Sequence, residues 1–277
     1  MIFKRYIAGI FVFFLLIPSP CLFAETTNIA TQEEIRPKQP QEALEDKTII
    51  ASSSYEYSWV EFANTDRKWT TLRGRVAYPQ KGLELPYLEV RRYSRSSEED
   101  YAYDLGGYYK FGEVLAHAEA SVGSDVDYIY DFALLGEIEH PVYKTVFLNE
   151  KYKFLSYAAG DVHILSPGVI YYFDNHYVYA SYNAGITENR GTGHWGIGKL
   201  NFKATKNLDF WVGTAIGQRL YDIKEDPDAD NQQGYIIFSG VRLNAAKNAH
   251  FYINLLYGEE DPDFTQRAIE GGLAIGF

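Results

Sequence analysis

The sequence predicts an all-β fold, a transmembrane antiparallel up-and-down β-barrel of about 14 strands. Three observations predict it. The C-terminal segment alternates in polarity, so that Ile269, Leu273, Ile275 and Phe277 lie on one face of a strand. Residues 1–24 have the order of charged and apolar residues that is typical of a secretory signal peptide. The chain between them divides into alternating segments of about ten residues, separated by turn residues.

The last strand also indicates the cellular location of the protein. In bacterial outer-membrane barrels the final strand presents an apolar stripe to lipid and closes the sheet. An aromatic C-terminus with apolar residues at alternate positions resembles the signal that the barrel-assembly machinery recognises, so Ile269, Leu273, Ile275 and Phe277 are the predicted assembly signal. The expected location is the outer membrane of a Gram-negative cell. The expected partners are its lipid, its lipopolysaccharide and the assembly machinery.

The N-terminal segment is interpreted as an export signal. The basic pair Lys4–Arg5 precedes an almost unbroken apolar run over residues 6–17, and cleavage is expected after Ala24. The run is shorter than the roughly 20 apolar residues of a transmembrane helix. Lipidation at Cys21, the single cysteine, is the alternative. It is disfavoured because Pro20 stands where a lipoprotein signal needs a small residue.

Composition favours a membrane barrel over other classes. No apolar stretch of about 18 residues follows the signal, so we expect no membrane-spanning helix. The chain has 24 Tyr and 17 Phe but one Met, which is typical of aromatic girdles at two membrane interfaces. Loss of residues 1–24 removes two basic residues and no acid, which leaves 24 basic and 37 acidic residues. That charge disfavours nucleic-acid binding, which needs a basic face. A soluble β-sandwich or lipocalin-like barrel would alternate too, but the signal peptide and the terminal Phe favour the membrane.

The sequence indicates three segments: a signal peptide at 1–24, a flexible periplasmic linker at 25–48 and the barrel at 49–277. Short turns are typical of the periplasmic rim and longer loops of the outside, which places both chain ends in the periplasm. If residues 141–166 form one long excursion, the strand number falls to 12. The predicted strands lie near residues 50–62, 69–79, 86–95, 101–111, 113–123, 131–141, 151–159, 166–174, 176–187, 194–204, 208–221, 234–245, 249–258 and 267–277.

Alternation within each strand separates a lipid face from a lumen face. On the strand that begins at Leu208, Phe210 and Val212 face lipid, whereas Asp209 and Trp211 face the lumen. The lumen set carries charges of both signs and therefore indicates no ion preference. Pairing among such charges is mainly structural, because an unpaired buried charge is costly. The predicted lumen residues are Arg73, Arg75, Glu89, Arg91, Asp104, Lys110, His117, Glu119, Lys199, Lys203, Asp209, Trp211, Arg219, Arg242 and Glu270.

Four aromatic residues are also expected to point inward: Tyr108, Trp195, Trp211 and Tyr252. They are candidates for a track on which sugar rings stack, although filling of the lumen and anchoring at the interface are favoured. A barrel of 12 to 14 strands lies between the filled eight-stranded barrels and the open porins. A structural or adhesive barrel with a filled lumen is therefore an alternative to a pore.

The chain resembles the YaiO-like outer-membrane barrels over roughly residues 49–277. The resemblance is carried by Tyr55 and Tyr57, by the segment Trp-Thr-Thr-Leu-Arg-Gly at 69–74, and by Ser-Pro-Gly-Val-Ile-Tyr-Tyr-Phe at 166–173. None of these is a catalytic motif. The resemblance implies an integral outer-membrane protein that acts as a pore or assembly factor in the export of a surface polysaccharide. It implies no functional residues.

An enzyme is the rival hypothesis. One predicted outward loop contains Asp125 and Asp127, and another contains Asp161 and His163. Together they resemble the rim of omptin proteases, where an Asp–His pair activates water. Alternatively, His163 and Ser166 are candidates for part of a nucleophilic triad of the phospholipase type. Two-residue patterns of this kind recur by chance in a chain with 37 acidic residues, and short loops disfavour the omptin type. We therefore expect a protein that is not an enzyme.

No metal site or cofactor is predicted. His140, His176, His194 and His250 have no neighbouring residues at metal-ligand spacing.

Overall fold

The computed structural model describes the chain from residue 49 onward, apart from short segments. Within the described residues, no helix is long and apolar enough to cross a membrane. The predictions for residues 1–48, the signal peptide and the linker, lie outside them. The described residues are 49–62, 65–80, 83–95, 98–126, 128–187, 191–218, 233–260 and 264–277.

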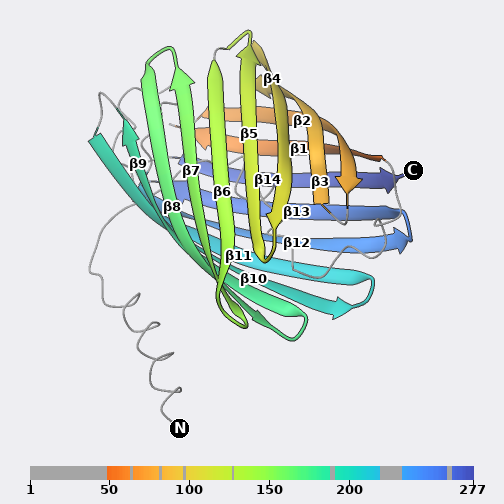
Figure 1. Ribbon diagram of the computed structural model, residues 1–277. Coiled ribbons are helices and arrows are strands. Elements are labelled where there is room, and N and C mark those ends of the chain that lie inside the picture. Colours follow the sequence, from red (N-terminus) through yellow and green to blue (C-terminus); the bar gives the residue numbers. More distant parts are fainter. Residues whose placement is uncertain are drawn as a thin grey trace.

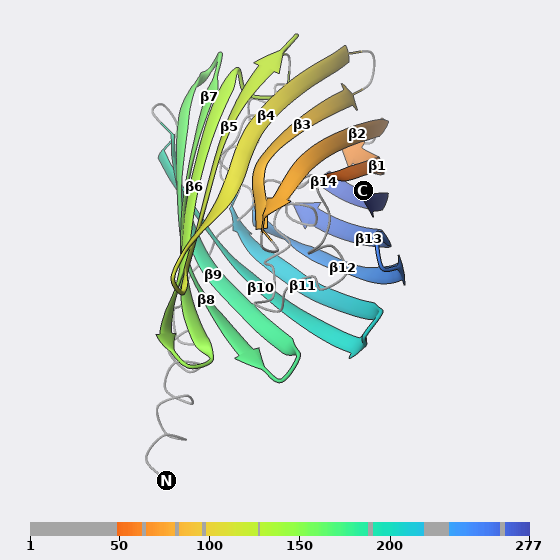
Figure 2. The same ribbon diagram turned by 45° about the vertical axis from the view of Figure 1, so that its right-hand side comes forward.

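Fourteen antiparallel strands close into one barrel (Figure 1). Each strand pairs with its neighbours in sequence, and β1 pairs with β14, which lies beside it in Figure 2. The predicted fold class and strand number are confirmed, and the alternative of 12 strands is wrong. The strands are β1 (Ile50–Phe62), β2 (Thr65–Gln80), β3 (Leu83–Arg95), β4 (Glu98–Phe111), β5 (Val114–Ser124), β6 (Phe132–Tyr143), β7 (Val146–Tyr157), β8 (Gly160–Phe173), β9 (His176–Thr187), β10 (Gly191–Thr205), β11 (Leu208–Gln218), β12 (Gln233–Ala246), β13 (Ala249–Glu260) and β14 (Phe264–Gly276).

The segment 141–166, which the sequence left ambiguous, belongs to three paired strands. β6 continues through Pro141 to Tyr143, and a two-residue turn leads into β7. Proline cannot donate to a ladder and is confined to edges and bulges. Pro141 accordingly lies at a register shift between β6 and β7. β7 and β8 therefore begin earlier than predicted, at Val146 and Gly160.

The outer face of the barrel is banded. Its middle carries exposed aliphatic side chains, among them Leu72, Leu105 and Ile253. Exposed aromatic side chains are most frequent near the rim at which β14 ends, and five others are exposed elsewhere on the outer face: Tyr55, Trp59, Tyr103, Tyr152 and Tyr182. This banding is the pattern expected of a wall that faces lipid between two interfaces. The exposed aromatic residues near that rim are Tyr78, Tyr109, Phe111, Tyr143, Tyr171, Phe202, Phe210, Phe251 and Phe277.

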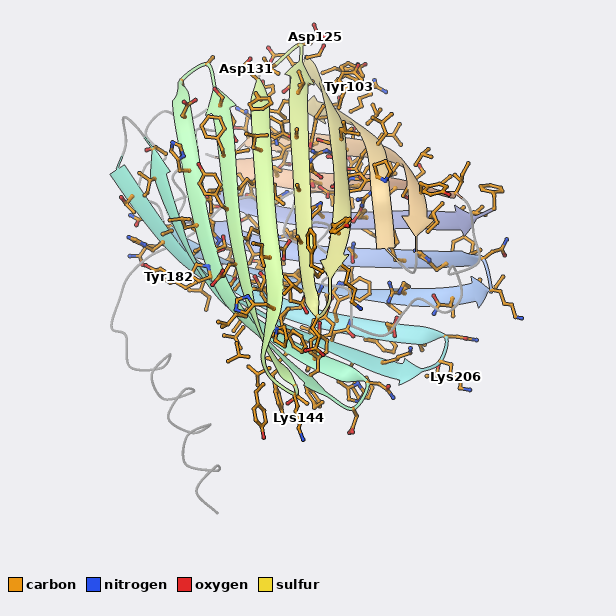
Figure 3. The ribbon with its side chains drawn as sticks, viewed as in Figure 1. Tyr103, Asp125, Asp131, Lys144, Tyr182 and Lys206 are labelled. Carbon is orange, nitrogen blue, oxygen red and sulfur yellow. The ribbon has the colours of Figure 1, made fainter. Side chains whose placement is uncertain are left out.

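The two rims differ in their connections. At the rim where β14 ends, called the short-turn rim below, Gly112 has a φ of 62°, the left-handed conformation that a tight turn needs. At the opposite rim, the connection from β5 to β6 extends from Asp125 to Asp131, whereas β7 and β8 are joined by a two-residue turn at 158–159. Figure 3 shows Lys144 and Lys206 at the short-turn rim and the two aspartates at the other. Two-residue turns at the short-turn rim are 112–113, 144–145, 174–175, 206–207 and 247–248.

We expect Leu105→Arg to destabilise the folded barrel in a bilayer by about 2–4 kcal/mol, the cost of a cation at the lipid-facing midplane. Leu105 lies midway along β4 and is 59% exposed on the outer face. Urea unfolding of the protein refolded into lipid vesicles measures the effect. Asp131→Arg, in an exposed connection, is the control and should change stability little. Equal stability of the two variants would mean that the outer face meets water.

Candidate functional site

The inner wall of the barrel is the candidate site. Successive side chains of a strand point to opposite faces, so each strand contributes every second residue to this wall. In β2, Leu72 is exposed on the outer face, whereas Arg73 reaches Glu89 on β3 at 3.4 Å between guanidinium and carboxylate. The same alternation along all fourteen strands gives a wall on which polar and charged residues are concentrated.

Polar side chains of this wall form a continuous stripe, which we call the polar stripe. It consists of two adjacent rows, and within a row each residue is the register partner of the next residue on the neighbouring strand. Because strands tilt in a closed barrel, such a row rises from one rim toward the other. Neither row contains Val, Ile, Leu, Met or Phe. One row is Tyr172, Tyr177, Asn201, Trp211, Gly240, Asn254, Glu270, Glu56, Thr71, Tyr93 and Asp100. The other is Lys203, Asp209, Arg242, Tyr252, Gly272, Ser54, Arg73 and Arg91.

The stripe connects the two rims. Tyr172 lies one residue before the end of β8 at the short-turn rim, and Asp100 lies two residues after the start of β4 at the opposite rim. The next row on the other side of the first is mixed, since it contains Ile170, Phe238 and Leu256 together with Lys199 and Ser58. A solute that follows the stripe therefore meets polar and aromatic groups over the whole height of the wall.

A buried arginine anchors the part of the wall nearest the opposite rim. Arg91 donates two hydrogen bonds to Asp104, at 2.8 and 2.5 Å, and one to the Tyr130 hydroxyl at 2.8 Å. The Ser121 hydroxyl donates a further bond to Asp104. Arg91 and Asp104 are 4% and 1% exposed, so removal of either would leave a charge buried without its main partner.

The ion-pair network continues across the closure of the barrel. Arg73 lies 3.4 Å from Glu89 and 3.6 Å from Glu270 of β14. Glu270 also accepts hydrogen bonds from Asn254 at 2.7 Å and from the Tyr252 hydroxyl at 3.2 Å. These contacts tie β2 and β3 to β13 and β14, so the charges of the stripe are matched within the wall.

A second cluster lies closer to the short-turn rim. The Tyr87 hydroxyl contacts His117 Nε2 at 2.8 Å and donates to Glu119. Tyr108 stacks on His117 with 4.0 Å between ring centroids. The Arg75 guanidinium lies 3.5 Å above the Tyr87 ring. Cation–π attraction of this kind holds the Tyr87 ring in place.

Inward aromatic rings lie flat against the wall. A Cβ on Gly106 would lie 2.3 Å from the Tyr87 hydroxyl, and one on Gly272 would lie 2.3 Å from ring carbons of Tyr252. Only glycine leaves room for a ring over the backbone of the adjacent strand. These rings therefore cover the wall of the barrel in place of projecting across its centre.

The predicted lumen residues can now be placed. Lys110 has an inward position but is exposed near the short-turn rim, and Arg219 lies outside the described residues. Sequence reasoning missed Glu56, although Glu56 alternates with Tyr55 on the outer face, a signal that was available. At buried or half-buried inward positions lie Arg73, Arg75, Asp104, Glu119, Lys199, Asp209, Trp211 and Arg242.

Asp161 and His163 share the outer face of β8, and Ser166 does not join them. Asp161 and His163 belong to β8, and their predicted place in an outward loop is wrong. His163 faces outward and contacts the Tyr152 hydroxyl at 2.8 Å, whereas Ser166 is buried on the inner wall. Three residues apart on one strand, the two side chains point to opposite faces. Asp125 lies in the connection after β5, and position 127 lies outside the described residues.

The predicted assembly signal lies on the outer face of β14. Ile269 and Phe277 are exposed there, and Leu273 and Ile275 are half-buried at the same face. Among the described residues, no group of three or more His, Cys, Asp or Glu side chains is arranged to hold a metal ion.

Comparison with known proteins identifies the fold. No protein-family model matches the sequence, and no curated protein matches it. Solved structures do match. A bacterial polysaccharide outer membrane secretin aligns with 81% of this chain and 98% of its own, at a TM-score of 0.56 and 9% identity. The protein has the fold of the outer-membrane β-barrels.

Two further solved structures match with similar scores. The CymD monoaromatic hydrocarbon channel aligns with 92% of this chain and 95% of its own, at a TM-score of 0.53 and 10% identity. Omp33 of Acinetobacter baumannii aligns with 83% of this chain and 98% of its own, at a TM-score of 0.50 and 10% identity.

We expect Asp104→Ala to destabilise the barrel by about 3–5 kcal/mol, because it leaves the Arg91 charge buried without its main partner. Arg92→Ala is the matched control. It removes the exposed ion pair between Arg92 and Glu99 on the same hairpin, and such pairs contribute little. Urea unfolding and heat-modifiable gel mobility report both. A loss of stability as small for Asp104→Ala as for the control would contradict the structural role of the buried pair.

Proposed function

We propose that this protein is an outer-membrane pore for a hydrophilic chain, in the export of a surface polysaccharide. The observation that carries the proposal is the polar stripe, which joins the two rims inside a closed barrel. A barrel that served only as an anchor would need no polar path from one rim to the other. Ion pairing within the wall also keeps these charges from holding a passing solute too tightly.

The size of the barrel supports a pore. Fourteen strands about 4.8 Å apart and tilted by about 40° enclose a circle whose backbone is roughly 28 Å across. Barrels of about eight strands are filled by their own side chains, and those of about sixteen hold an aqueous channel. Fourteen strands are nearer in number to the barrels that hold an aqueous channel.

The location and orientation are part of the proposal. Aliphatic and aromatic bands on the outer face support insertion in a membrane. Two-residue turns at the short-turn rim support a periplasmic position for that rim, since outer-membrane barrels have short periplasmic turns. Both ends of the barrel domain, Ile49 and Phe277, would then face the periplasm; they meet there in a backbone hydrogen bond of 2.9 Å.

The sugar-polymer part of the proposal rests on two kinds of support. The YaiO-like resemblance implies polysaccharide export, and the secretin that shares the fold is named as a polysaccharide protein. The residue types of the stripe agree with a sugar chain, because sugars present both hydroxyl groups and apolar C–H faces. Asn, Glu and Arg side chains suit the first, and Tyr and Trp suit the second.

A second candidate is a channel for apolar molecules. Three apolar clusters of the inner wall, on β6 to β14, meet at Ile197, and CymD, which shares the fold, is named as a hydrocarbon channel. An apolar path would carry no ionic current. The two candidates therefore differ in conductance.

We expect residues 25–277, refolded into planar bilayers, to give steady single-channel current steps. Lys110→Glu should shift the reversal potential in a salt gradient toward cation selectivity, because Lys110 is exposed at an inward position near the mouth. Lys206→Glu makes the same charge change in a turn of the short-turn rim and should shift the reversal potential less. Silence from verified folded protein would contradict the pore, and would favour the apolar channel or a filled lumen.

We also propose that the barrel-assembly machinery recognises the outer face of β14. Deletion of Phe277 should lower the amount of protein in the outer membrane of cells several-fold, while refolding of purified protein into detergent stays unchanged. Membrane fractionation and in vitro refolding yields provide the two measurements. A matching defect in both would mean that Phe277 stabilises the barrel itself.

A further inference from the structure

Exposed cations on the outer wall of the strands lie in one sector of the barrel. Among the described residues, the exposed Lys and Arg side chains that the strands carry on this face are Lys68 of β2, Arg92 of β3 and Arg267 of β14. These strands and β1 are neighbours around the closure of the barrel (Figure 2). Arg92 is paired with Glu99. Because a cation that faces lipid is costly near the midplane, the height of the other two on the wall matters.

Lys68 and Arg267 flank an exposed tryptophan. Trp59 of β1 is the register partner of Arg267 on one side and of Lys68 on the other, which gives a row of cation, indole and cation. The indole is 50% exposed, and its ring makes a T-shaped contact with Tyr57 at 4.5 Å between centroids. Neighbouring strands lie about 4.8 Å apart, so the backbones that carry the two cations are roughly 10 Å apart across the indole.

This row lies at one boundary of the apolar band. Phe277, near the short-turn rim, is ten residues beyond Arg267 on the outer face of the same strand. At about 3.3 Å per residue and a tilt of about 40°, the two are about 25 Å apart along the barrel axis, the height of the apolar band of an outer-membrane barrel. Toward the middle, the next outer-face row contains Leu255 and Ile269, which are exposed. The cations therefore lie where lipid headgroups begin.

Both cations are available to a ligand. Among the described residues, neither Lys68 nor Arg267 forms an ion pair. The Arg267 guanidinium is 6.0 Å from the centroid of the Tyr257 ring, at the limit of a cation–π interaction, and it attracts Glu259. That carboxylate already accepts hydrogen bonds from the hydroxyl groups of Tyr257 and Tyr235. A phosphate at the row would thus meet two cations without first breaking an ion pair.

The acidic residues of this sector lie on the rim side of the row. Glu61 and Asp66 are exposed register partners, two residues beyond Trp59 on β1 and two before Lys68 on β2. They repel a phosphate that rises toward the rim, and the apolar band excludes one that sinks. The outer wall here has three levels, which are apolar, then cation and indole, then acidic. A phosphate is favoured at the middle level alone.

This order of groups fits a lipid whose headgroup is a phosphorylated sugar. Its acyl chains would pack on Leu255 and Ile269, its phosphates would meet the two cations, and a sugar ring between them would pack on the exposed indole. Lipid A, the anchor of lipopolysaccharide, has this chemistry, because its two phosphates are attached at opposite ends of a glucosamine pair. A glycerophospholipid with one phosphate would meet one cation and would offer the indole no sugar ring.

We propose that Lys68, Trp59 and Arg267 form a binding site for lipid A on the outer face at the closure of the barrel. The site rests on the proposed orientation, with the short-turn rim in the periplasm, because lipopolysaccharide occupies the outer leaflet. It goes beyond the proposed pore, since it needs no open lumen.

The test uses residues 25–277 refolded in detergent micelles, with native mass spectrometry of the bound lipid. The probes are bisphosphorylated lipid A, dephosphorylated lipid A with the same acyl chains, and phosphatidylglycerol. The wild type should retain bisphosphorylated lipid A at the lowest concentration. Lys68→Gln and Arg267→Gln should each weaken that binding about fivefold, the effect of one cation near an anionic lipid surface, and should change binding of the dephosphorylated form little. Trp59→Ala should weaken binding of both forms of lipid A.

Lys206→Gln and Lys247→Gln are the matched controls, since each removes an exposed lysine from a turn of the short-turn rim. Heat-modifiable gel mobility verifies that every variant is folded. An equal loss of lipid A binding in the controls would overturn the site, because it would show attraction to cations at any position. Phosphatidylglycerol held as tightly as lipid A would overturn the choice of lipid, and equal binding of both forms of lipid A would overturn the role of the cations.

The outcome is separate from that of the conductance measurement. A barrel that gives no current but binds lipid A through Lys68 and Arg267 would uphold the site and contradict the pore. A conducting barrel that binds the three lipids alike would overturn the site and leave the pore intact.

Discussion

Closure of the hydrogen-bonded ladder is the constraint on which the rest of the structure depends. A backbone group without a partner is costly in hydrocarbon, so a sheet that crosses a membrane cannot keep a free edge. Here β1 and β14 pair along their full length, from Ile50 opposite Gly276 to Phe62 opposite Phe264. Even the last residue contributes, since the Phe277 amide donates to the Ile49 carbonyl.

Closure separates the side chains into those on the outer face and those on the inner face, and the two faces have different environments. Outside, aliphatic side chains such as Leu105 are exposed where a soluble protein would place polar ones. Inside, polar groups are packed closely enough that they must satisfy one another. Arg91 with Asp104, and Arg73 with Glu89 and Glu270, show how this is achieved. The interior is therefore ordered by charge pairing as much as by apolar packing.

The same interior must leave room if the protein is a pore. Pairs of glycine and aromatic residues on adjacent strands resolve this conflict, because a ring that lies over a glycine contributes contact area without extending into the lumen. Trp211 over Gly240 and Tyr252 over Gly272 place such rings within the polar stripe. A wall built in this way is well packed.

Local alternation was enough to predict much of this protein. It indicated the barrel, the fourteen strands and the inward direction of Arg73 and Asp209, because the period of a strand is fixed by backbone geometry. It failed at Asp161 and His163, where the start of β8 looked like a loop. Strand ends depend on pairing with a partner strand, which local sequence does not contain.

The tertiary structure alone decided which residues meet. The contact between Arg73 and Glu270 joins segments from opposite ends of the barrel domain, and the approach of Trp211 to Gly240 and Asn254 depends on the register of three strands. Register is set by all the pairings around a closed ladder together, and a shift of one residue would turn every side chain of a strand to the other face. The sequence by itself therefore determined the two faces of each strand, and only closure of the barrel decided how those faces line up.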